Sequence, residues 1–203
     1  MSNENIDSMY RAVGSALSNW TRVEIQIYQI FGVIHVLTIM QSGGGFSSDM
    51  RIPYAALDTI DSFSSKVRMV NNALKAALED LDEEAKHIWE AWESAKSRVE
   101  SNTQNRNKLA HWTVACGFKE GAKVRLVPPP YSNREHQGVS INDVKNWEGA
   151  FIATQNLLVD VVSQLTSHHG LQQKKAMQTV EQIRIGLSPD SPLREKIIRD
   201  LQN

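Results

Sequence analysis

The feature that most constrains the fold is an apolar side chain at every third or fourth position along four long segments of the chain. In the first segment, residues 7–40, this series consists of Tyr10, Val13, Leu17, Trp20, Ile27, Phe31 and Ile34. Such spacing places the apolar side chains on one face of a helix, which must be buried against other helices. Three further segments with the same spacing begin near Pro53, Asp82 and Ser140. The pattern predicts an all-α fold, an up-and-down four-helix bundle.

Local signals mark the ends of these helices. Pro53 suits the first turn of the second helix, and Asp82 is a good N-cap for the third. Ser140, followed by Asp143, is a capping signal for the fourth helix, and Gly170 is expected to end it. The apolar stripe of the second helix comprises Leu57, Ile60, Phe63, Val67, Val70, Leu74 and Leu81. The polar residues between them are predicted to form a solvated face: Ser64, Lys66, Arg68, Asn71 and Asn72.

Two segments outside the four helices have their own patterns. Residues 114–116 and 123–127 flank a Lys-Glu-Gly-Ala turn and predict a short β-hairpin inserted before the last core helix. Residues 171–187 have an amphipathic pattern, a Ser/Pro-rich break follows, and residues 193–201 predict a last short helix. We therefore expect a bundle domain over residues 1–170 and a helical C-terminal appendage over 171–203, which could dock on a partner subunit.

Composition narrows the class of protein. The chain has 203 residues, 41% of them hydrophobic and 22% charged, which is ordinary for a soluble domain with one core. The net charge of -1 provides no global positive field for nucleic acid, so any RNA contact must be local. Cys116 is the sole cysteine, and residues 1–5 do not begin a signal peptide. These features favour a cytoplasmic protein with no membrane span.

The third helix changes character toward its end. Its apolar stripe runs through Val99, and the next members are Asn102, Arg106 and Leu109. Asn102 and Arg106 are four positions apart and share a face. With Lys108, they give the helix a basic end where an RNA phosphate could bind, although the helix dipole alone also favours cations there.

Glu24 interrupts the apolar stripe of the first helix. A carboxylate in a helical core is costly unless it is paired. One interpretation is that Glu24 reaches water at the edge of the stripe. The other is that Glu24 faces a polar pocket that holds Arg106.

Arg106 and His111, separated by four residues and with Asn107 directly after the arginine, form an Arg-x4-His motif. This motif at the end of the third long helix resembles the signature of the HEPN superfamily, whose active members are metal-independent ribonucleases. The resemblance covers roughly residues 7–168, because HEPN domains are similar helical bundles and tolerate an insertion before the last helix. It implies a homodimer in which Arg106 and His111 of two protomers meet. Positions five apart on an ideal helix are offset by about 140°, which also favours a site shared by two copies.

The resemblance implies attack of a ribose 2′-hydroxyl on the adjacent phosphodiester, without cofactor or metal. His111 would transfer protons because an imidazole titrates near neutrality. Arg106 would stabilise negative charge on the phosphate. Asn107 and Asn102 would orient the histidine or the phosphate, and Glu24 would hold Arg106 in place. RNA is the expected substrate, and an antitoxin or regulatory protein is the expected partner of such a toxin or defence effector.

Each role has a structural alternative. His111 could simply cap the end of its helix, and Arg106 with Glu24 could form a structural ion pair. The chain would then be a non-catalytic helical interaction module, a use also found among HEPN proteins. A nucleotide-binding enzyme is disfavoured because residues 43–45 precede no lysine-threonine pair. His168 and His169 predict a frayed helix end, because no Cys or carboxylate stands at ligand spacing from them.

Overall fold

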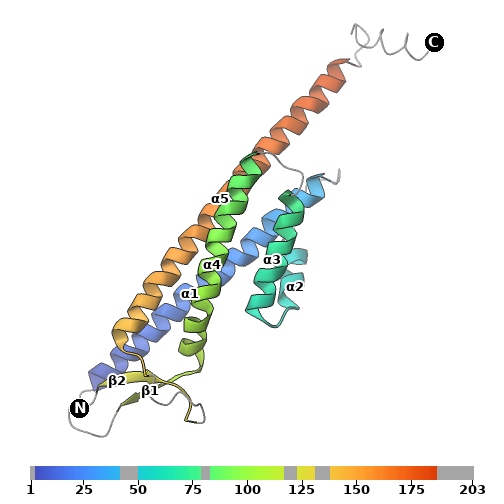
Figure 1. The fold of residues 1–203 in the computed structure, drawn as a ribbon. Coiled ribbons are helices and arrows are strands. Elements are labelled where there is room, and N and C mark those ends of the chain that lie inside the picture. Colours follow the sequence, from blue (N-terminus) through green and yellow to red (C-terminus); the bar gives the residue numbers. More distant parts are fainter. Residues whose placement is uncertain (1–2, 42–49, 79–82, 117–122, 131–137, 187–203) are drawn as a thin grey trace, which may run out of the picture. The chain divides into compact units, whose positions relative to one another are not determined.

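Five helices and one antiparallel β-hairpin make up the part of the chain that the computed structural model describes (Figure 1). The described residues are 3–41, 50–78, 83–116, 123–130 and 138–186. The elements are α1 (Asn3–Gln41), α2 (Arg51–Asp58), α3 (Phe63–Leu78), α4 (Glu83–His111), β1 (Thr113–Cys116), β2 (Val124–Val127) and α5 (Ile141–Gly186). The expectation of a mostly helical protein with a hairpin before the last helix is confirmed.

Helix α1 contacts α2, α3, α4 and both strands, so it is the central element among them. Its apolar stripe lies one position away from the predicted one over the first turns. Tyr10 is 55% exposed, whereas Met9, Ala12 and Ala16 are buried. Both series have helical spacing, and the packing of neighbouring helices selects between them. The stripe then continues through Trp20, Val23, Ile27, Ile30 and Ile34.

The predicted second helix is two helices in the structure. Helix α2 ends at Asp58, and α3 begins at Phe63. The break follows from a cap, because the backbone N–H of Ser65 donates to Ser62 Oγ at 3.1 Å. A serine side chain in this position satisfies a backbone donor that the start of a helix leaves open. Two residues of this break, Asp61 and Ser62, line a pocket between α1, α3 and α4.

Helix α4 follows its predicted stripe closely. Ala85, Ile88, Trp92, Ala95, Val99, Asn102 and Leu109 are all buried. Thus the polar Asn102 takes a core position, as its place in the series predicts. Within the same stripe Arg106 is only half-buried, because it lies where the core opens into a pocket.

Helix α5 begins as predicted and ends later than predicted. Asp143 Oδ2 accepts hydrogen bonds of 2.7 Å from both the backbone N–H and the hydroxyl of Ser140, and the Asp143 N–H donates back to Ser140 Oγ at 3.3 Å. This reciprocal cap confirms the predicted start. The predicted end at Gly170 is wrong, since the helix continues to Gly186 without interruption. A single glycine costs a helix only about 1 kcal/mol, which favourable neighbours can offset.

The chain divides into two compact units, Met1–Gln164 and Leu165–Asn203, so the boundary lies inside α5 and not at a helix end. In the first unit, α5 packs on α1 through Phe151, whose ring meets the Trp20 ring edge-on at 5.1 Å. It packs on α4 through a hydrogen bond from Asn102 Nδ2 to Thr154 Oγ1 of 3.0 Å. The residues that line the pocket between α1, α3 and α4 all belong to this first unit.

The hairpin has the predicted strands. β1 and β2 pair antiparallel with Thr113 opposite Val127 and Cys116 opposite Val124. Leu126 also forms an isolated bridge with Val139, just before α5. The hairpin therefore connects the end of α4 to the start of α5 and lies near the start of α1 in Figure 1.

Several predicted features lie outside the described residues. They are the Asp82 cap, the hairpin turn (119–122) and the break and last short helix (188–201). Among the helices that are described, none is long and apolar enough to cross a membrane.

Candidate functional site

A pocket of about 380 Å³ lies between α1, α3 and α4. Its lining is polar, with only two aromatic side chains. The lining residues are Glu24, Tyr28, Asp61, Ser62, Phe63, Ser64, Lys66, Thr103, Arg106 and Asn107. The structure thus brings three of the predicted site residues, Glu24, Arg106 and Asn107, to one pocket.

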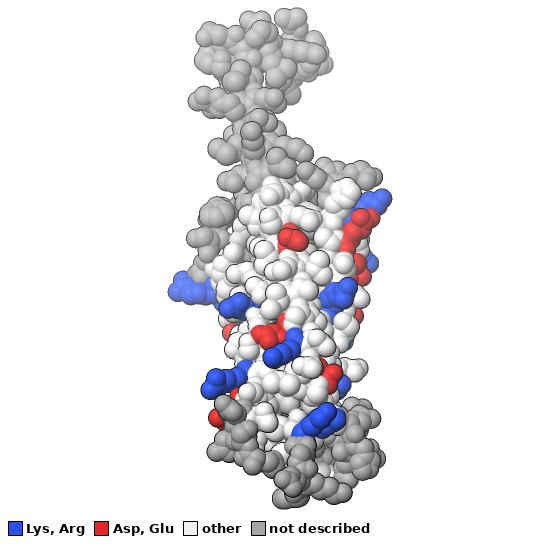
Figure 2. All heavy atoms as spheres, turned by 90° about the vertical axis from the view of Figure 1, so that its left-hand side faces the viewer, with Lys and Arg blue, Asp and Glu red and all other residues white. Residues whose placement is uncertain are grey.

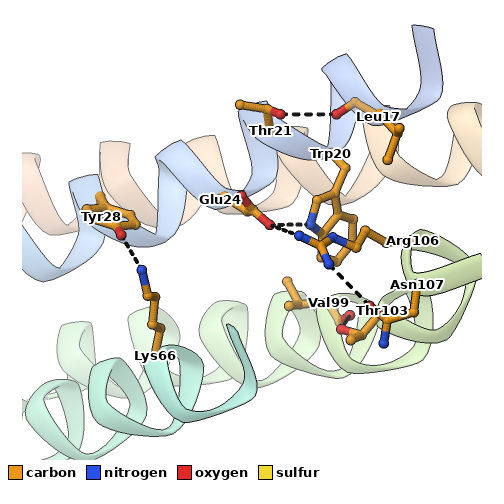
Figure 3. Close-up of polar contacts among 10 residues, drawn as sticks. All are labelled: Leu17, Trp20, Thr21, Glu24, Tyr28, Lys66, Val99, Thr103, Arg106 and Asn107. Atoms are coloured by element: carbon orange, nitrogen blue, oxygen red, sulfur yellow. Dashed lines mark hydrogen bonds and ion pairs between the residues drawn. The ribbon is translucent and has the colours of Figure 1, made fainter. Parts of the chain in front are cut away.

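Glu24 and Arg106 form an ion pair across this pocket (Figure 3). Arg106 Nη2 lies 3.4 Å from Glu24 Oε1, and the two side chains are 33% and 30% exposed. Trp20 Nε1 donates to the same carboxylate oxygen at 2.7 Å. Glu24 therefore holds the guanidinium at the pocket while Trp20 holds Glu24. Both partners remain partly exposed, so this is not a fully buried ion pair.

Trp20 gives this arrangement a rigid base. Its ring is almost fully buried and meets the rings of Phe63 and Phe151 edge-on, at centroid distances of 5.2 and 5.1 Å. Edge-to-face contacts of this kind are favourable beyond the burial of apolar area. The acceptor that positions Arg106 is therefore anchored to a side chain of α1 that contacts α3 and α5.

A second cation, Lys66 of α3, reaches the same pocket. Its ammonium donates to the Tyr28 hydroxyl, lies 4.9 Å from the centroid of the Tyr28 ring, and lies 3.9 Å from Asp58 Oδ1. The Tyr28 hydroxyl in turn donates to Asp58 Oδ1 at 2.6 Å. The Lys66 side chain is only 17% exposed, so its predicted place on a solvated face is wrong. Glu24 and Tyr28 are one helical turn apart on α1, which places the two cation contacts about 6 Å apart along the helix axis.

The two candidate asparagines have different surroundings. Asn107 Oδ1 accepts from Arg106 Nη1 at 3.3 Å and lines the pocket. Asn102 is buried and donates to Thr154, whose own hydroxyl donates to the carbonyl of Ala150. Asn102 thus lies inside the bundle and not among the described residues that line the pocket.

His111 is the last residue of α4 and is exposed. It is not among the described residues that line the pocket with Arg106. This separation agrees with the angular offset expected for two positions five apart on a helix. Within one chain, the pocket between α1, α3 and α4 therefore includes Arg106 but not His111 among its described lining residues.

Lys108, one turn before Trp112, lies between two tryptophans. Its Nζ is 5.6 Å from the centroid of the Trp112 ring and 5.2 Å from that of Trp147 on α5. A cation above an aromatic face is attracted by the ring, by about 0.5–1 kcal/mol at an exposed site. These contacts fix the position of Lys108 beside the end of α4, near His111 in the chain.

The charges of the surface are mixed. On the face shown in Figure 2, acidic and basic side chains of the described residues are interspersed, and neither sign dominates. Within the described ranges, no three His, Cys, Asp or Glu side chains are grouped closely enough to hold a metal ion. On this face, the mixed charges form no broad basic surface for a polyanion.

The prediction from sequence missed part of the pocket lining: Tyr28, Lys66, Thr103 and the residues at the break before α3. One signal was present, since Asp61 and Ser62 with Ser65 three residues later form a typical start of a helix. No local signal marks Tyr28 or Lys66, because each acquires its role through a residue 38 positions away in the chain.

Comparisons with models of known protein families, with curated proteins and with solved structures found no match in any of the three. The resemblance to HEPN domains therefore rests on the Arg106–His111 motif, its position at the end of α4 and the hairpin before the last helix.

Proposed function

We propose that this protein is a cytoplasmic, metal-independent endoribonuclease of the HEPN type, built on a four-helix up-and-down bundle in which α2 and α3 together take the place of one helix. The observation that carries the proposal is the guanidinium of Arg106, held at an open pocket by Glu24 and Asn107 at the end of α4. Because the guanidinium is partly exposed at the pocket, it is accessible to a ligand.

The chemistry follows from the residue types. Arg106 offers donors with the planar geometry that phosphate oxygens accept, and its charge would stabilise the negative charge that develops as the 2′-hydroxyl attacks phosphorus. As the 2′-oxygen bonds to phosphorus, the bond from phosphorus to the 5′-oxygen breaks and a cyclic phosphate forms. His111 would accept the proton of the 2′-hydroxyl or donate one to the departing 5′-oxygen, and such proton transfer typically contributes about 10²–10⁴ in rate. The exposure of His111 lets it reach a substrate that lies on the surface.

A homodimer would complete the site. Since His111 is not among the described residues that line the pocket of Arg106, the His111 of a second copy would approach the Arg106 of the first. RNA would lie along this interface. The activity would be that of a toxin or defence effector, and a restraining partner such as an antitoxin is part of the proposal.

The separation of Arg106 from His111 also supports the alternative function. If the chain is a monomer, the motif has no composite site, and a non-catalytic helical interaction module is then the better description. The oligomeric state therefore bears directly on the choice.

The direct test is incubation of a mixed RNA pool with the purified protein in excess EDTA, beside the variants Arg106→Ala and His111→Ala. The expected result is cleavage that leaves cyclic-phosphate ends and is lost in both variants while their folding is intact. His87→Ala is a matched control, because His87 is exposed on the same helix, far from its end. Cleavage that survives in both site variants would contradict the proposal.

Mixing the two inactive variants tests the composite site. In a two-fold dimer of one Arg106→Ala chain and one His111→Ala chain, one of the two shared sites is intact. Because half of the dimers in an equal mixture are of this kind, recovery of up to about a quarter of wild-type activity is expected. No recovery, although the chains exchange, would place the arginine and histidine of each site in one chain.

A further inference from the structure

The pocket between α1, α3 and α4 contains a second cation that the Arg-x4-His motif does not include. Lys66 comes from α3 and Arg106 from α4, and both side chains reach toward α1 (Figure 3). Each is held by an α1 side chain, Lys66 by Tyr28 and Arg106 by Glu24. The pocket is thus a place where two cations from different helices are held at defined positions.

We propose that this pocket binds one nucleotide unit of the RNA strand, with phosphates of that strand contacted by Lys66 and Arg106, and that Tyr28 is the positioning residue for Lys66. The inference rests on the proposed function in one respect, namely that the phosphate belongs to RNA. Its volume of about 380 Å³ is at the small end of the range for ligand sites, which suits one nucleotide unit and not a folded RNA element.

The state of Lys66 supports a binding role. A lysine usually extends its ammonium into water along an apolar stem. Here the ammonium is turned inward to Tyr28 and the side chain is 17% exposed. An ammonium shielded from water interacts more strongly with a negative ligand than an exposed one, because the effective dielectric constant is lower. The hydroxyl and ring of Tyr28 together restrict where the ammonium can lie.

The charges explain how the pocket is stable when empty and still suited to a phosphate. Its charged lining residues are Glu24, Asp61, Lys66 and Arg106, two acids and two bases. Arginine has five N–H donors and lysine three, more than the described contacts of Arg106 and Lys66 require. Each cation can therefore donate to a phosphate oxygen while it keeps its contact with Tyr28 or Glu24.

The experiment measures binding separately from cleavage. A short single-stranded 2′-O-methyl oligonucleotide of mixed sequence, labelled with a fluorophore, cannot be cut because its 2′-hydroxyls are blocked. Its affinity for the full chain is measured by fluorescence anisotropy over a range of salt concentrations. Lys66→Met keeps the aliphatic stem and removes the charge, and is expected to weaken binding by about tenfold or more. The slope of log affinity against log salt should fall by about 0.7, the value for one phosphate contact on a single strand.

Three variants control the result. Lys75→Met removes a charge from an exposed position on the same helix and should leave affinity nearly unchanged. Lys66→Arg should restore most of the affinity, which a loss of packing alone would not allow. Tyr28→Phe keeps the ring and removes the hydroxyl, so its affinity should lie between those of wild type and Lys66→Met. Urea unfolding of each variant confirms that the fold is intact.

The outcomes separate this inference from the proposed nuclease. If wild type cuts no RNA but the oligonucleotide binds in a Lys66-dependent manner, the pocket assignment stands and the nuclease proposal fails. If RNA is cut and Lys66→Met binds and cuts like wild type and Lys75→Met, the pocket assignment is overturned and the nuclease stands. A free mononucleotide that binds as tightly as the oligonucleotide, through Lys66, would overturn the assignment of the pocket to an RNA strand.

Discussion

Glu24 Oε1 lies 3.4 Å from Arg106 Nη2 and joins the middle of α1 to the last turns of α4. The same oxygen accepts a hydrogen bond from Trp20 Nε1, so one carboxylate orders a buried tryptophan and a pocket-lining arginine at once. The geometry makes Glu24 a positioning residue for Arg106. It also separates two contributions of Glu24, its charge and its ability to accept a hydrogen bond.

Two substitutions of Glu24 should separate the contribution of its charge to stability from that of the hydrogen bond it accepts. Glu24→Gln keeps an acceptor for Trp20 and loses only a partly exposed ion pair, which costs about 0–1 kcal/mol of unfolding free energy. Glu24→Ala also leaves the Trp20 N–H without this acceptor and should cost about 1–3 kcal/mol. Urea unfolding measures both values. Equal losses in the two variants would show that the hydrogen bond to Trp20 contributes nothing.

Asn102 should act through packing and not through catalysis. Its buried amide donates to Thr154, so Thr154→Val leaves a buried N–H without its acceptor and should cost about 1–3 kcal/mol. Replacing both residues, as in Asn102→Ala with Thr154→Val, should cost less than the sum of the single changes. RNA cleavage per folded molecule is expected to stay at the wild-type level in each variant. A loss of cleavage in stable Asn102→Ala protein would instead place Asn102 in the site.

Asp143 should make the stability of α5 depend on pH in the acid range. The Ser140 hydroxyl, then the Ser140 backbone N–H, lower the pKa of Asp143, and Arg125 adds a smaller effect. A lowered folded-state pKa stabilises the fold above the unfolded-state value of about 3.9, and this contribution disappears as pH falls through the folded-state pKa. The difference in urea midpoint between wild type and Asp143→Asn should therefore be largest near neutral pH and vanish in strong acid. A difference that grows in acid would contradict this assignment.

Alanine substitutions at three glycines inside helices should differ in their effect on stability. A Cβ at Gly14 of α1 or Gly149 of α5 would meet no atom within 4 Å. Alanine at either position should raise the unfolding free energy by about 0.5–1 kcal/mol, because it restricts the unfolded chain and favours the helix. A Cβ at Gly32 would lie 2.9 Å from Met50 Sδ and 3.2 Å from Tyr54 Cε1, where α2 approaches α1. Gly32→Ala is therefore expected to be less stable than the other two variants in thermal unfolding, and a higher stability would mean that α2 moves away easily.

Much of the fold follows from local pattern. The stripe of α4, the paired strands and the start of α5 at Ser140 were all predicted, because helical spacing, strand alternation and side-chain caps act over a few residues. The predictions that were wrong, the end of α5 and the stripe at the start of α1, also relied on local signals alone. A glycine at 170 costs a helix about 1 kcal/mol, too little to end it by itself. In the first turns of α1, two series of residues both have helical spacing, and the packing of neighbouring helices selects between them.

The candidate site could be predicted from the sequence only in part. Its motif residues Arg106, Asn107 and His111 could be named from sequence, because they follow one another on a single helix. The pocket itself could not be predicted, because Glu24 and Arg106, like Tyr28 and Lys66, meet only after α1 has packed against α3 and α4. Contacts between residues far apart in the chain depend on how helices pack, and helical periodicity reports which face is buried but not which side chain lies opposite. The sequence by itself therefore determined the helical character of the chain and the motif, and only the tertiary structure decided that Arg106 lines the same pocket as Lys66.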